Sequence, residues 1–165
     1  MKPSLLIALI FALGLGVVAW FLFLQPEGQD NSVPDETWLA YGIELFEKQE
    51  FAAAIEDLRN VPAGSPHEAK ARYYEGSAHM MLKDHDAAMA SLEAALALNP
   101  NDTGTLYALG VVSYKLGNLK LAKGYFSSVL EINPNDEQAK GLMDIMAKLE
   151  RNSVAEADEE ASTED

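Results

Sequence analysis

The stretch that decides the fold is residues 103–136, TGTLYALGVVSYKLGNLKLAKGYFSSVLEINPND, which ends in the tetrapeptide Asn133-Pro134-Asn135-Asp136. The same tetrapeptide stands 34 residues earlier, as Asn99-Pro100-Asn101-Asp102. Three sets of residues recur with this offset: Gly42, Gly76 and Gly110; Ala54, Ala88 and Ala122; and Pro66, Pro100 and Pro134. An offset shared by several positions is the signature of an internal repeat, and it divides the chain into three units, 35–68, 69–102 and 103–136.

Each unit contains two apolar-periodic runs of about a dozen residues separated by a polar turn, which predicts a helical hairpin. The turns are Lys48-Gln49-Glu50, Lys83-Asp84-His85-Asp86 and Lys115-Leu116-Gly117-Asn118. The prolines fall where helices must end or begin. In Ser65-Pro66-His67-Glu68 the serine is predicted to cap the next helix, with Glu68 completing a capping box.

The recurring glycines predict close packing inside each hairpin. A glycine within a helix costs about 1 kcal/mol relative to alanine, so three glycines at one register require a compensating contact. Pairing Gly42 with Ala54, and likewise in the other two units, would let the two helix backbones approach closely. Larger apolar residues would fill the layers around this contact: Trp38 and Leu106 on first helices, and Leu58, Leu92 and Phe126 on second helices.

This pattern resembles the tetratricopeptide repeat, and the resemblance covers 102 of the 165 residues. The third unit carries the signature most fully, at Leu106, Leu109, Gly110, Tyr114, Gly117, Asn118, Ala122, Phe126, Val129 and Pro134. The resemblance implies an all-α fold, a right-handed α-solenoid of three hairpins. Two departures stand out. Arg72 and Glu75 occupy positions where bulky apolar residues are usual, and Pro62, Gly64 and Pro66 shorten the second helix of the first unit.

The two ends of the repeat region differ in character. Residues 137–151 carry one apolar stripe and predict a seventh helix that caps the solenoid, since terminal repeats need a polar outer face. Residues 152–165 hold six acidic side chains and no basic one, so this tail is predicted to be disordered. Residues 25–34 form a short linker that precedes the repeat domain of residues 35–151.

The first 24 residues predict a membrane anchor. Leu5 to Leu24 is twenty residues without a charge, long enough as a helix to cross a hydrocarbon core of about 30 Å. Lys2 precedes it and only acidic charges follow before Lys48, so the positive-inside rule places the N-terminus in the cytoplasm and the repeats outside, in the periplasm or another extracytoplasmic space. The alternative is a signal peptide cleaved after Ala19, which would leave the sequence WFLFL at the new N-terminus.

Charge and composition exclude several classes of function. From Gln25 onward there are 26 acidic residues against 11 basic ones, the full 12 less Lys2, and such a surface repels nucleic acid. There is no cysteine. The three histidines, His67, His79 and His85, do not have the spacing of a metal pair on a helix. No phosphate loop or nucleophile motif is present, so we expect neither a cofactor nor an enzyme.

The candidate site implied by the family is the inner face of the solenoid, which the first helix of each hairpin lines. By position the lining residues are Leu39, Ile43 and Phe46; Tyr73, Ser77 and Met80; and Tyr107, Val111 and Tyr114. They form an apolar and aromatic track that would bind a peptide or helix of another protein. The alternative for part of this track, in particular Phe46 and Tyr114, is the core between helices. Some relatives hold a peptide carboxylate with lysines and asparagines at these positions. Lys70 and Lys115 alone do not make that clamp.

The layout of anchor and repeats is similar to that of bacterial proteins that assist assembly of envelope complexes, including cytochrome c maturation, secretion and pilus systems. This favours a membrane-anchored interaction scaffold. A second interpretation is a structural subunit that forms oligomers without a transient client. A third is the same domain facing the cytosol from an organelle membrane, although that would favour basic residues after the span, where this chain has Glu27 and Asp30.

Overall fold

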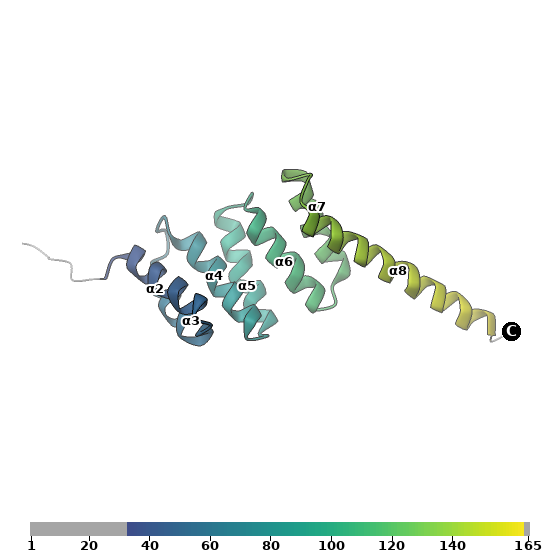
Figure 1. The fold of residues 1–165 in the computed structure, drawn as a ribbon, viewed down its shortest axis with the longest axis horizontal. Helices are drawn as coiled ribbons and strands as arrows, with labels where there is room; N and C mark the ends of the chain where they lie inside the picture. Colours follow the sequence, from purple (N-terminus) through teal and green to yellow (C-terminus); the bar gives the residue numbers. More distant parts are fainter. Residues whose placement is uncertain (1–32, 164–165) are drawn as a thin grey trace, which may run out of the picture. The chain divides into compact units, whose positions relative to one another are not determined.

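The computed structural model describes residues 33–163 of the chain. Over this range the fold consists of seven α-helices and no strand: α2 (Asp35–Glu47), α3 (Phe51–Arg59), α4 (Glu68–Met81), α5 (His85–Leu98), α6 (Thr103–Lys115), α7 (Leu119–Ile132) and α8 (Glu137–Thr163). The helices pair as α2–α3, α4–α5 and α6–α7, and α8 follows (Figure 1). The prediction of three helical hairpins followed by a seventh helix is therefore confirmed.

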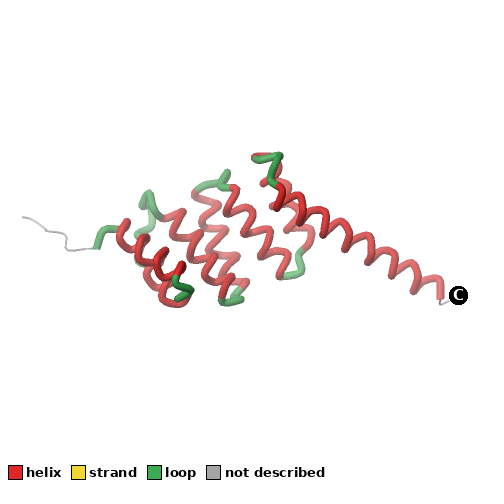
Figure 2. The backbone as a smooth tube through the Cα atoms, viewed as in Figure 1, coloured by secondary structure: helices red, strands yellow, loops and turns green. Residues whose placement is uncertain are grey.

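The hairpins stack in chain order and present two different edges. Figure 2 shows the turns inside the hairpins along the lower edge, and the loops that join one hairpin to the next along the upper edge. Helix α4 packs against both α2 and α3, and α6 packs against both α4 and α5. Each hairpin thus buries its apolar face against its neighbours, as repeat proteins require.

The three hairpin turns share one backbone geometry. Gln49, Lys83 and Gly117 stand at the same register and all have positive φ, at 64°, 63° and 79°. The amide of the next residue bonds to the carbonyl five residues back, with 2.9 Å between donor and acceptor in each turn: Glu50 to Leu45, Asp84 to His79, and Asn118 to Ser113. This is a Schellman ending, which favours glycine at the left-handed position.

Only the third repeat has that glycine, so the turns offer a matched pair of substitutions. Gly117→Ala is expected to destabilise the domain by about 1 kcal/mol, because a Cβ is strained in the left-handed region. Lys83→Gly is expected to shift stability in the opposite direction, by up to about 1 kcal/mol, because it removes that strain. Urea denaturation followed by circular dichroism measures both. A change in unfolding free energy of the same sign in both variants would show that strain at the left-handed position does not determine the stability of these turns.

The repeated glycines contact bulky side chains of the second helix rather than alanine side chains. A Cβ at Gly42 would lie 2.5 Å from Leu58 Cγ, at Gly76 2.6 Å from Leu92 Cγ, and at Gly110 2.7 Å from Phe126 Cζ. The carbonyl oxygens of Ala54 and Ala88 come next, at 3.4 and 3.1 Å. The glycine therefore makes room for the large residue four positions after the alanine, and the fully buried alanines line the same interface.

The loop before α4 differs in detail from the predicted capping box. Helix α4 begins at Glu68, and His67 is its N-cap without a side-chain cap. The His67 amide donates to Ser65 Oγ at 3.0 Å, while the Gly64 amide donates to Glu68 Oε2 at 2.6 Å. Serine and glutamate still satisfy free amides, but the glutamate bonds one residue earlier in the chain than the box requires. The prolines of the three repeats lie in the turns that follow α3, α5 and α7.

Helix α8 is longer than predicted. The sequence predicts a helix that ends at Arg151 and a disordered tail at residues 152–165, whereas the structure continues the helix to Thr163. Two properties of the sequence allow this. No glycine or proline interrupts the chain after Gly141, and the tail is rich in alanine and glutamate, which are strong helix formers.

The predicted membrane span, residues 5–24, lies outside the residues that the structure describes, as does nearly all of the linker. Among residues 33–163, no helix is both long and apolar enough to cross a membrane.

Candidate peptide-binding groove

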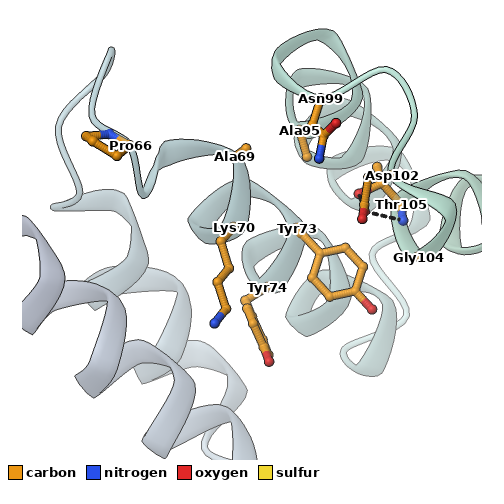
Figure 3. Close-up of a pocket in the computed structure, with 10 residues that line it drawn as sticks. All are labelled: Pro66, Ala69, Lys70, Tyr73, Tyr74, Ala95, Asn99, Asp102, Gly104 and Thr105. Carbon is orange, nitrogen blue, oxygen red and sulfur yellow. Dashed lines mark hydrogen bonds between the residues drawn. The ribbon is translucent and has the colours of Figure 1, made fainter.

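The first cavity lies between α4 and α6 and has a volume of about 540 Å³. Lys70, Tyr73 and Tyr74 project from α4 toward it, and Asn99, Asp102 and Thr105 lie on its other side (Figure 3). Asp102 is the N-cap of α6, since its Oδ2 accepts from the Thr105 amide at 2.8 Å and from the Thr105 hydroxyl. The Asp102 carboxylate is thus bonded to the first turn of α6. Lys70, in contrast, has no ion pair among the described residues.

The second cavity lies on the other side of α6 and measures about 260 Å³. Its walls come from three helices, and its lining is mostly apolar: Tyr107, Val111, Tyr114 and Lys115 of α6, Phe126 of α7, and Leu142, Ile145 and Met146 of α8. Tyr107 packs edge-to-face on Phe126, with ring centroids 5.5 Å apart. We call the two cavities, with α6 between them, the groove.

Helix α8 contributes to the groove in addition to ending the solenoid, whereas the sequence predicts only a capping role for it. The repeat offset contained the signal, because Val111 plus 34 is Ile145, and Ile145 is 47% exposed at the second cavity. Extending the register by one unit also places Asp144 where the repeats have glycine. Its carboxylate is exposed, so no further helix packs there and the stacking of hairpins ends.

The three candidate residues of the first repeat do not line either cavity. Leu39 was predicted to face the groove, but it is 6% exposed and belongs to a core cluster with Leu58 and Ala71. At the same register Tyr73 and Tyr107 stay half-buried, because a tyrosine ring reaches beyond an interface that covers a leucine. Ile43 and Phe46 pack against the same cluster, and Phe46 contacts the ring of Tyr74 edge-to-face.

The other candidates divide between the groove and its support. Tyr73 lines the first cavity, and Tyr107, Val111 and Tyr114 line the second. Ser77 donates its hydroxyl to the Tyr73 carbonyl at 2.9 Å, and Met80 packs against the core around Leu92. A binding role for these residues stays a prediction. The structure adds Tyr74, Asn99, Leu142 and Ile145 to the candidates.

The unusual polar residues of the second repeat form an ion-pair network away from the groove. Glu75 is 4% exposed, and its two carboxylate oxygens accept from Arg59 Nε at 2.8 Å and from Arg72 Nη1 at 2.9 Å. The network joins α3 to α4. Among residues 33–163 there is no cluster of three or more histidine or acidic side chains that could hold a metal ion.

Stacked helical hairpins with an apolar groove define a helical-repeat protein. Two family models, both described as tetratricopeptide repeat, match the chain over residues 39–103 and 79–149. The chain belongs to the tetratricopeptide repeat family, whose members are protein-interaction domains.

Known proteins support this assignment. The chain is 25% identical over 108 residues to BBSome complex member BBS4 of Xenopus tropicalis, covering 64% of this chain but only 21% of that protein. The crystal structure of MamA is 26% identical with a TM-score of 0.63, covering 80% of this chain and 83% of MamA. The first repeat domain of Spaghetti (RPAP3), bound to an HSP90 peptide, is 23% identical with a TM-score of 0.66. The match covers 70% of this chain and 91% of that domain. The last similarity shows the fold alone.

Proposed function

We propose that this protein is an interaction scaffold whose groove binds a segment of a partner protein. The observation that carries the proposal is the pair of cavities on either side of α6, both lined by half-exposed tyrosines. Tyrosine suits such a surface because it combines a large apolar contact with a polar tip.

The two cavities suit different parts of one bound segment. The second is mostly apolar and fits an anchoring aliphatic or aromatic side chain, as hot-spot residues require. The first is more polar, with Lys70, Asn99 and two tyrosines positioned to bond the segment's backbone and polar groups. Domains of similar fold have been solved with HSP90 and HSP70 peptides, which supports a peptide ligand here.

The location that we propose follows from the sequence of the first 24 residues. Residues 5–24 would anchor the chain in the cytoplasmic membrane as a single span, with the N-terminus in the cytoplasm and the repeats in the periplasm. A scaffold in that position would aid assembly of an envelope complex, of the cytochrome c maturation, secretion or pilus type. This part of the proposal rests on the apolar run and on the charges that flank it.

Gly104→Phe is expected to block the groove without disturbing the fold. A Cβ at Gly104 would lie 3.5 Å from Asp102 Oδ2 and 3.9 Å from Tyr73 Cε2, both ordinary contacts, so a larger side chain projects beside Tyr73 into the first cavity. We expect partner binding to fall at least about tenfold, equivalent to about 1.4 kcal/mol, with no loss of helicity. Ala90→Phe, at an exposed position of α5, is the matched control and should bind as the wild type does.

Crosslinking from a photoreactive residue at Tyr107 in intact membranes, with the captured protein identified, measures this binding. The scaffold proposal expects one partner species whose yield falls in the Gly104→Phe variant and not in the Ala90→Phe variant. Capture of this chain alone would favour the structural subunit that oligomerises without a client. Capture that is insensitive to Gly104→Phe would remove the groove from the proposal.

A further inference from the structure

The charge of this acidic protein is distributed unevenly. Residues 103–151 contain six of the twelve basic residues and five of the 26 acidic ones, a balance of +1. The remaining residues hold the other six bases and 21 acids, a balance of −15. Three of the five acids of this region, Glu131, Asp136 and Glu137, lie at the end of α7 and at the α7–α8 loop, on the upper edge of Figure 2. Away from that edge, residues 103–151 therefore carry more basic than acidic side chains.

The geometry brings these bases together at the α6–α7 turn. Lys123 Nζ forms an ion pair with Glu150, so the 148–151 turn of α8 lies against the start of α7. Lys115 also shares the second cavity with Ile145 of α8. We call this region the tip surface; its bases are Lys115, Lys120, Lys123, Lys148 and Arg151. The described residues show no ion pair for Lys115, Lys120 or Lys148.

Large apolar side chains are exposed among these bases. Leu116 is 46% exposed, Leu121 38% and Leu149 43%. Leu116 and Leu121 flank the tight turn at Gly117, where φ is 79° and no other group lies within 4 Å of a Cβ position. The tip surface is thus a protruding turn with leucines that point to solvent and lysines around them. A protruding shape does not enclose a peptide as the groove does.

We propose that the tip surface docks on an anionic lipid bilayer, with its leucines in the interface and its lysines at the head groups. Lysines around exposed apolar residues are the chemistry of peripheral membrane binding. Nucleic acid would leave the leucines without a partner, and the strongly acidic remainder of the chain repels it. Repulsion of the acidic residues outside this region restricts the approach to the α6–α7 turn, where the bases and the exposed leucines lie together. The docking is independent of whether the groove binds a partner.

The absence of cysteine permits a direct test on the full chain. Leu116→Cys carries an environment-sensitive fluorophore, and Ile132→Cys, 46% exposed near the opposite edge, carries the same probe as the control. The protein is reconstituted with bilayers of phosphatidylcholine alone, or of phosphatidylcholine with phosphatidylglycerol. We expect a blue shift of the probe at position 116, and its quenching by brominated lipid, only with the anionic lipid, and neither response at position 132.

The double variant Lys115→Glu with Lys120→Glu should abolish the response at position 116. Each lysine near an anionic surface strengthens attachment about fivefold, so the variant is expected to weaken it about 25-fold or more. Circular dichroism checks that the variant keeps its helices. No shift at position 116 in anionic bilayers, or equal shifts at both positions, would overturn the proposal. A shift without lipid that grows with protein concentration would also overturn it, because a second copy, through its acidic residues 152–165, would then cover the tip surface.

Discussion

Replacing Arg59 and Arg72 together by leucine is expected to destabilise the domain by about 3–5 kcal/mol, the usual cost of leaving one partner of a buried ion pair alone. Glu75 is the group left alone. Its side chain is 5% exposed, and the two arginines are its hydrogen-bond partners. Arg59 and Arg72 are themselves 56% and 32% exposed, so they reach solvent more easily than the carboxylate does. The arginines must therefore be removed, rather than the glutamate, to give the full effect.

Adding Glu75→Leu to that double variant should restore most of the lost stability. Buried ion networks replaced by apolar residues of similar volume are often as stable as the original or more so. The other two repeats carry apolar or aromatic residues at these registers, Trp38 and Leu106 for position 72 and Tyr41 and Leu109 for position 75. Chemical denaturation measures the three proteins. The exposed pair of Glu44 and Lys48, 59% and 56% exposed, is the control, and Glu44→Ala should cost less than about 1 kcal/mol. A double variant no less stable than Glu44→Ala would show that Glu75 is not held by its partners.

This network shows what the sequence could and could not predict. The offset of 34 residues between Gly76 and Gly110 predicts the hairpins, because one repeated packing contact requires one repeated register. The same register marks Arg72 and Glu75 as departures. The repeat register cannot show that Arg59, from the preceding repeat, also bonds to Glu75, because that contact depends on how two hairpins stack.

The lining of the candidate groove could be predicted only in part, for a similar reason. Position within the repeat places Leu39, Tyr73 and Tyr107 on one face, but it does not state how far each side chain extends beyond the next helix. The side chain of Leu39 ends inside the interface between helices, whereas the side chains of Tyr73 and Tyr107 extend beyond it. Ile145 lines the second cavity because α8 continues the register of the first helices, which the 34-residue offset from Val111 indicates. The length of α8 follows from the helix propensity of its alanines and glutamates, which acidic composition alone does not indicate.

Phe126→Ala is expected to cost about 3–5 kcal/mol, as truncation of a buried phenylalanine does. Phe126 is fully buried and belongs to the cluster that joins α6, α7 and α8 through Leu106, Val129 and Met146. Its loss would therefore loosen α8 as well as the third hairpin. Denaturant unfolding gives the total cost. Hydrogen exchange of the α8 amides should rise in the variant, and unchanged exchange there would contradict the proposed coupling.

The ring of Phe126 also determines what a methyl group at Gly110 does. In the wild type a Cβ at position 110 would lie 2.7 Å from Phe126 Cε1 and Cζ, and overpacking of this kind costs about 1–3 kcal/mol. In the Phe126→Ala background the ring is absent, so Gly110→Ala should instead stabilise by up to about 1 kcal/mol through helix propensity. Gly124→Ala, with nothing within 4 Å of its Cβ position, is the control and should stabilise both backgrounds equally. The sign change at Gly110 alone would show that the repeated glycine exists to admit the large residue of the facing helix, whereas the same sign in both backgrounds would show that it does not.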